Sequence, residues 1–236
     1  MTRGQMARLE TLMRMQAFLQ AKSDALGQLN GSPSRTELDR GIAAIRNLAA
    51  EQAAAHTEST SRTKYKYMLR ERLRQEHLRQ IATIANAGLT SPPAVRGLRL
   101  PPGSVSDRAL VDVATAMGSL AQQHEDVFTR QGLAADFVVQ LHAAVAGFTE
   151  ALEARDASQA REKGATAGIR YELSRAHDVV GVLNALITKY AARRPELLDG
   201  WKHAKRVRAK PGTASGSTAA RRAPTETSAA KDDSAP

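Results

Sequence analysis

Apolar side chains recur every three or four residues along most of the chain, which is the spacing of one face of an α-helix. The first such stretch covers residues 5–29 and stops before Gly31-Ser32-Pro33. Ser34 followed by Glu37 has the spacing of a capping box, so a second helix is predicted to begin there. A start two residues later, in which Thr36 caps the helix, is the alternative.

The second stretch covers residues 36–88, and its apolar stripe is interrupted once. Residues 56–63 are rich in Ser and Thr, which are poor helix formers, before the stripe resumes with Met68, Leu69 and Leu73. The stretch is therefore either one helix of about 50 residues, roughly 75 Å long, or two shorter helices.

Residues 89–103 form a proline-rich connector. Pro92-Pro93 and Pro101-Pro102 disfavour a helical conformation at the residue before each pair, so the connector is predicted to be extended or looped. A loop of this length is uncommon inside a compact domain, and it predicts a boundary between two parts of the chain.

The helical pattern returns after the connector. One helix is predicted from residue 104 to about 131, a second stretch covers residues 136–192, and a short helix follows Pro195. Beyond Val207 no aliphatic side chain is larger than alanine, so residues 208–236 are predicted to form a disordered basic tail.

The two halves of the body have the same outline. A shift of 100 positions aligns Leu38 with Val138, Leu73 with Leu173, and His77 with His177. One hypothesis is a duplicated helical hairpin; the other is that two leucine- and arginine-rich helices match by chance.

Composition agrees with an all-α fold. Ala, Leu, Arg, Gln and Glu are abundant, whereas the aromatic residues that favour strands make up only 4% of the 236 residues. The predicted architecture is an elongated antiparallel bundle of long helices. Its predicted parts are a first hairpin (1–88), the connector (89–103), a second hairpin with a short terminal helix (104–207), and the tail (208–236).

The chain carries 34 basic and 24 acidic residues, a net charge of +10, and this balance favours polyanionic partners. Two basic clusters stand out, one with Tyr65 and Tyr67 among its cations and one near the end of the last helix. Aromatic and cationic side chains together are typical of single-stranded nucleic-acid binding, although a solvated helix exterior has the same pattern. The candidate polyanion contacts are Arg62, Lys64, Lys66, Arg70, Arg72, Arg74, Lys202, Lys205, Arg206 and Arg208.

Catalytic and metal-binding motifs are missing from the sequence. There is no cysteine, no Gly-x-Ser-x-Gly elbow, and no histidine with a glutamate three positions before it, as a di-iron bundle needs. The glycine-rich stretch 164–168 lacks the lysine and hydroxyl pair of a phosphate-binding loop, so it is interpreted as a helix-packing patch. The chain is therefore predicted to be no enzyme and to need no cofactor, and no small-molecule substrate is identified.

The second half resembles a group of uncharacterised bacterial all-helical proteins over roughly a third of the chain. The residues that carry the resemblance are Gly164-Ala165-Thr166-Ala167-Gly168-Ile169, Leu173, Arg175, Val180, Leu183, Ala185, Leu197-Leu198, Trp201 and Ala204-Lys205-Arg206-Val207. The resemblance implies a helical fold and no particular activity.

Helices of about 50 residues need a partner along their whole apolar stripe. The leading functional expectation is accordingly a non-catalytic module that binds a protein partner or self-associates; the alternative is a nucleic-acid-associated protein. No apolar run is long enough to span a membrane and the N-terminus has no secretory signal, so a cytoplasmic location is expected.

Overall fold

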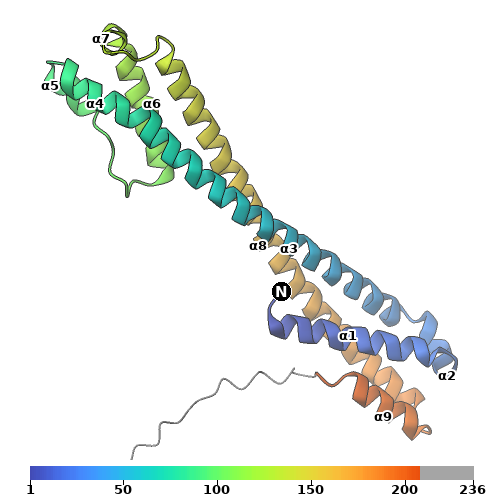
Figure 1. Cartoon of the computed structure of the whole chain (residues 1–236). Helices are drawn as coiled ribbons and strands as arrows, with labels where there is room; N and C mark the ends of the chain where they lie inside the picture. The colour runs from blue at the N-terminus through green and yellow to red at the C-terminus, as the bar shows by residue number, and fades with distance from the viewer. Residues whose placement is uncertain (208–236) are drawn as a thin grey trace, which may run out of the picture.

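The computed structural model of the chain describes residues 1–207, and this part is all-α without any strand, as predicted. The molecule is elongated (Figure 1). Two long helical rods run side by side in opposite directions, and shorter helices gather at both ends. The predicted tail, residues 208–236, lies outside the described residues.

Both long helical stretches are continuous, which answers the question that the interrupted stripe left open. The first rod consists of α3 (Pro33–Arg72), a π-helical turn η2 (Leu73–Leu78) and α4 (Arg79–Gly88). The second rod is a single helix, α8 (Phe137–Tyr190), whose 54 residues make it about 80 Å long.

The first rod begins two residues earlier than the capping box predicted. Ser32 is the N-cap, its hydroxyl accepts a hydrogen bond from the Arg35 amide at 3.3 Å, and Pro33 takes the first helical position. Proline is well placed there because that position needs no amide donor. The predicted start at Ser34 is therefore wrong.

The predicted helix over residues 5–29 is also broken. The α-helix α1 (Arg3–Ala21) ends at Lys22, and a short turn α2 (Ser23–Leu26) and a 3-10 turn η1 (Gly27–Gly31) follow it. Gly27 has φ of +34°, close to the left-handed range that only glycine adopts at little cost, and this lets the chain turn back toward α3.

The connector contains a helix that the sequence argument excluded. Residues Pro92–Gly97 form α5, with Pro92 at the first helical position. The paired prolines restrict the residue before them, but they are compatible with the first turn of a helix. The expectation that the connector is extended or looped throughout is therefore wrong for this segment.

Three further helices complete the described residues: α6 (Asp107–Gln122), α7 (Glu125–Arg130) and α9 (Pro195–Ala204). The order of elements repeats, because a helix of 16 to 19 residues, a long rod and a short helix occur twice. Leu38 and Val138, and likewise Leu73 and Leu173, are buried at matching places in the two rods. The duplication itself stays a hypothesis.

Two separate hydrophobic cores lie at the ends of the molecule, and each draws on both halves of the sequence. The α1 lobe packs α1, the start of α3, the end of α8, and α9 around Leu38, Ile45 and Trp201. The α6 lobe packs η2 and α4 to α7 against the start of α8, around Leu110, Phe128 and Phe148. Each rod therefore belongs to both lobes.

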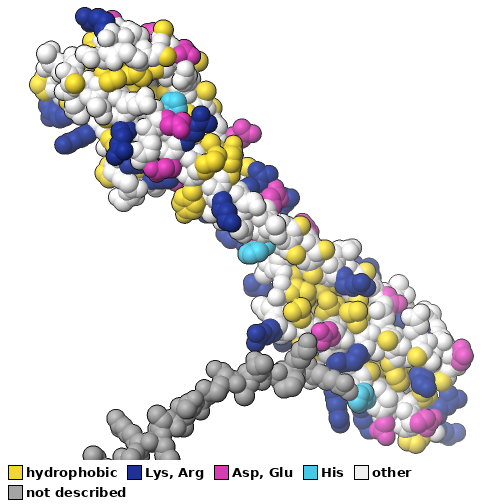
Figure 2. All heavy atoms as spheres, in the orientation of Figure 1, with side chains coloured by type: hydrophobic (Ala, Val, Ile, Leu, Met, Phe, Trp, Pro, Cys, Tyr) yellow, Lys and Arg dark blue, Asp and Glu magenta, His cyan; other side chains and the backbone are white. Residues whose placement is uncertain are grey.

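A narrow waist of two helices, residues 52–66 of α3 and 151–166 of α8, joins the lobes (Figures 1 and 2). Its buried side chains are small or polar and comprise Ala55, Ser59, Lys66, Ala151, Ser158 and Ala165. Such residues bury little apolar area, so the waist adds little hydrophobic stabilisation of its own.

Candidate interaction surfaces

The waist is held together by polar contacts that also fix the register of α3 against α8. Gln52 donates to the Thr166 hydroxyl at 2.7 Å, and His56 contacts Glu162 at 2.9 Å. Glu58 pairs with Arg161 of α8 and with Arg62 of its own helix. The hydrogen bond from Arg62 is the main reason that the pKa of Glu58 lies below its ordinary value.

Half of the six predicted cations on the first rod contact the connector or the start of α6. The Lys66 ammonium is buried and lies 2.6 Å from the Asp107 carboxylate at the start of α6, and Arg70 contacts the same carboxylate at 2.5 Å. Arg70 also donates to the carbonyl oxygens of Gly103 and Val105. These side chains fasten the connector to α3.

Arg74 continues this role, since its guanidinium donates to the carbonyl oxygens of Pro101 and Pro102 at 2.9 and 3.1 Å. A proline-rich segment offers carbonyl acceptors without helical partners, and the guanidinium groups supply donors for them. Lys66 is thus removed from the candidate polyanion contacts by its burial, and Arg70 and Arg74 already have partners in the connector.

The other candidates are more exposed. Arg62 and Arg72 form intrahelical pairs with Glu58 and Glu76, while Lys64 is exposed. In the second cluster Lys202 pairs with Asp199 at 3.1 Å.

Lys205 donates to the Asn184 side-chain oxygen at 2.6 Å, an oxygen that also accepts from the Trp201 indole. The Arg206 side chain is exposed, and its backbone carbonyl accepts a hydrogen bond from Arg14. Arg208 lies outside the described residues. The structure therefore does not bring the nine predicted cations among residues 1–207 together into one face.

Within residues 1–207, one side of the α3–α8 pair carries no further helix, and we call it the free side. α6 covers the flank of α3 that bears Lys66 and Arg70, and α1 covers the flank near Gln52, to which the N-terminal amine donates at 2.5 Å. The opposite flank contains positions 58, 65 and 72, which are seven residues apart and lie in one row along α3.

The two helices line the free side with side chains of different size. On α3, Tyr65 and Met68 are 54% and 53% exposed, and Arg72 lies one turn further on. On α8, three- and four-residue steps from Arg161 lead through Ala157, Ala154, Glu150, Gly147 and Ala143. The glycine has open space around it, because a Cβ placed there would meet nothing within 4 Å.

A pocket of about 410 Å³ lies at the α6-lobe end of this side, where the π-helical turn faces the start of α8. It contains His77, whose burial lowers its pKa despite the neighbouring Glu76, so burial favours the neutral imidazole. Phe137 and Ile81 supply apolar wall, and Gln80 and Gln140 supply amides. The pocket lining offers one weak base and no nucleophile.

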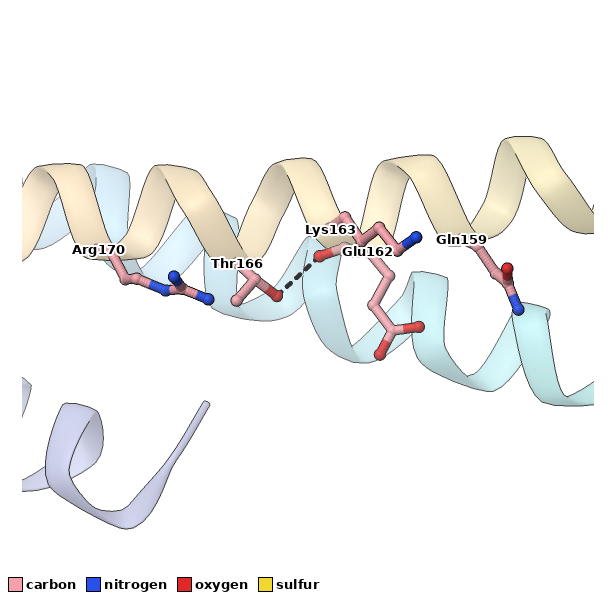
Figure 3. A pocket seen from close by; sticks show the side chains of 5 residues that line it. All are labelled: Gln159, Glu162, Lys163, Thr166 and Arg170. Atoms are coloured by element: carbon pink, nitrogen blue, oxygen red, sulfur yellow. Dashed lines mark hydrogen bonds between the residues drawn. The ribbon is translucent and has the colours of Figure 1, made fainter.

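A second hollow, of about 370 Å³, is lined by Gln159, Glu162, Lys163, Thr166 and Arg170, all of α8 (Figure 3). The Thr166 hydroxyl donates back to the Glu162 carbonyl at 2.8 Å. Lining residues from a single helix cannot enclose a ligand, and their charges are mixed. We therefore interpret it as a shallow surface depression beside the waist.

Within residues 1–207 no three His, Asp or Glu side chains are close enough together to hold a metal ion. None of the helices in that range has the length and apolar character needed to cross a bilayer. No family model matches the chain, and no curated protein and no solved structure is similar to it. The resemblance to uncharacterised bacterial helical proteins therefore stays a prediction.

Neither the free side nor the contacts that fasten the connector to α3 were predicted from the sequence. The exposed Tyr65 and Met68 were part of the sequence pattern, but only the position of α6 shows which flank of α3 stays uncovered. The pairing of Asp107 with Lys66 joins residues 41 positions apart. Nothing in the local sequence signals that pairing.

Proposed function

We propose that the chain is a non-catalytic helical module that self-associates through the free side of the α3–α8 pair. The observation that carries the proposal is the self-complementary character of this side. α3 presents large and basic side chains, Tyr65, Met68 and Arg72. Beyond Arg161, which pairs with Glu58 of the same chain, α8 presents small and acidic ones, including Gly147 and Glu150.

A two-fold contact between two copies places the α3 row of one copy on the α8 row of the other, twice. Tyr65 and Met68 then fill the space above Gly147 and Ala154, as knobs fill holes between packed helices. Arg72 comes near Glu150 of the second copy, which adds electrostatic complementarity. The waist becomes a four-helix bundle, so its small interior residues are covered on a second side.

Size-exclusion chromatography with light scattering, over a wide range of protein concentration, tests the proposal. We expect a dimer that dissociates on dilution, and we expect Gly147→Arg to leave a monomer. The open space at Gly147 accepts the larger side chain within one copy, and arginine stabilises a helix better than glycine does. Tyr65→Glu, which changes the α3 row, should likewise leave a monomer.

The matched control is Ala116→Arg, which adds the same side chain to an exposed position of α6, on the covered side of the pair. It should dimerise like the wild type. A wild-type chain that stays monomeric at the highest concentration, or a Gly147→Arg chain that dimerises normally, contradicts self-association through this side.

The nucleic-acid alternative has less support from the geometry. Of the six candidate cations on the first rod, Lys66, Arg70 and Arg74 have partners within the α6 lobe. Of those that remain, Arg72 lies in the same row as Tyr65 on the free side, where it contributes equally to contact with a second copy.

A further inference from the structure

A groove of about 640 Å³ runs between α1 and α8 in the α1 lobe, with α9 at one end. We propose that it binds a single-chain anionic amphiphile, a long-chain fatty carboxylate. This site is separate from the free side, since α1 covers the opposite flank of the pair.

The floor of the groove is apolar. Leu12 and Met15 of α1 and Leu173 of α8 are each at least 93% buried and line it, and Val180 extends the apolar surface. The side chains on the α8 wall, Ser174 and Gly181, are small and keep the groove open above this floor. An apolar floor below an open wall favours a hydrocarbon chain.

The charged side chains that line the groove are all basic. They are Arg8, Arg170 and Lys205, and His177 lies between them, while no Asp or Glu is among the lining residues. Within the described part of the chain, no salt bridge or side-chain hydrogen bond involves Arg8 or Arg170. Lys205, in contrast, is held by the Asn184 oxygen at 2.6 Å. The charge of the groove therefore selects an anion.

The two unpaired arginines lie at the same end of the groove. The hydrogen bonds of Met1 to Gln52 and of Gln16 to Asp39 show that α1 runs antiparallel to α3, and hence parallel to α8. Arg8 and Arg170 are the first lining residues of their helices, so both face the waist end. Two guanidinium groups are well suited to one carboxylate, because each presents parallel N–H donors.

The length of the groove fits an extended acyl chain. The groove follows α8 from Arg170 to Asn184, a rise of about 21 Å. One hydrocarbon leaflet of a bilayer is about 15 Å deep, so a fatty acid with its carboxylate at the arginine end fits this length.

Titration of the full-length protein with oleate below its micelle concentration, followed by calorimetry, tests the proposal. We expect saturable binding at one site per chain. Arg8→Ala combined with Arg170→Ala should weaken oleate binding at least tenfold. Oleylamine, which has the same chain and a positive head group, should bind at least tenfold more weakly than oleate.

Gly181→Leu provides the decisive variant. A Cβ at Gly181 meets nothing within 4 Å, so leucine extends into the groove without displacing the fold, and it should abolish oleate binding while circular dichroism stays unchanged. Gly164→Leu is the matched control, because Gly164 lies on the same helix with the same open space but outside the groove. Equal oleate affinity of Gly181→Leu and wild type, or no saturable binding by wild type, overturns the proposal.

Discussion

At the scale of single residues, the most consequential group is the carboxylate of Asp107. Burial alone would raise its pKa, but the hydrogen bonds and positive charges of Lys66 and Arg70 outweigh burial and hold the pKa below its ordinary value of 3.8. The carboxylate neutralises an ammonium that has only 7% of its side chain exposed. One acidic side chain thus makes the burial of Lys66 tolerable and anchors the first turn of α6.

Replacing this group should destabilise the α6 lobe. Asp107→Ala leaves the Lys66 charge buried without a partner, and we expect a loss of about 3 kcal/mol in the free energy of unfolding. Urea titration followed by circular dichroism measures it. Asp112→Ala, an exposed carboxylate on the same helix that has no salt bridge within the described residues, should change stability by less than about 0.5 kcal/mol.

The same pair predicts a pH dependence. Because the folded state lowers the pKa of Asp107, its contribution is fully present above pH 3.8 and is lost as the pH falls through the lower folded value. Asp107→Asn should therefore be less stable than wild type at pH 6, and the difference should shrink toward pH 2. A difference that stays constant over this range contradicts the role of the ionised pair.

At the scale of elements, the π-helical turn η2 explains an irregular spacing in the first rod. Leu73 and Leu78 are both at most 1% exposed although they are five residues apart, which an α-helix would place on different faces. The wider turn absorbs one additional residue and brings both leucines into the α6-lobe core. Such turns behave as single-residue insertions into an α-helix.

Deleting Gln75, an exposed residue of this turn, should convert it to a regular α-helix. The side chains of Leu78 and Ile81 then still face the α6-lobe core. We therefore expect the free energy of unfolding to stay within about 1 kcal/mol of wild type. Deleting Thr57 from the regular part of α3 rotates the following residues by about 100° against α8 and should disrupt the α6 lobe. Equal losses for the two deletions would contradict this interpretation; urea titration distinguishes them.

The sequence predicted those features of each element that depend on neighbouring residues. The stripes that include Leu38 and Leu141 indicated helices correctly, because helical periodicity is a local property. The π turn was missed because Leu78 was left out of the stripe, although its five-residue distance from Leu73 was the available signal. The helix at Pro92 was missed because proline signals both a break and a first turn.

The candidate site was less predictable for a different reason. Which cations are free depends on contacts between distant segments, such as that of Arg74 with the Pro101 carbonyl. The groove at Arg170 depends on how α1 lies across α8. Neither arrangement leaves a pattern within a window of neighbouring residues, so charge alone nominated Lys66 for a surface role that its burial excludes.

At the scale of the whole molecule, the two cores are separated by a waist that buries almost no large apolar side chain. Cooperativity in folding comes mainly from shared hydrophobic packing, and cores that share little can unfold in separate steps. The α1 lobe contains Trp201, the single tryptophan of the chain, buried against Phe18 with ring centroids 5.9 Å apart. Tryptophan fluorescence therefore reports on this lobe, whereas circular dichroism reports on both.

We expect urea unfolding to show two transitions by circular dichroism, of which only one coincides with the change in fluorescence. Ile45→Ala creates a cavity in the α1 lobe and Met117→Ala creates one in the α6 lobe, and each should cost roughly 2–5 kcal/mol. Ile45→Ala should shift the fluorescence transition to lower urea, while Met117→Ala should leave it in place and shift the other. If both probes follow one curve and both variants shift it, the waist couples the lobes more strongly than its buried alanines and serines can explain, and the molecule folds as one cooperative unit.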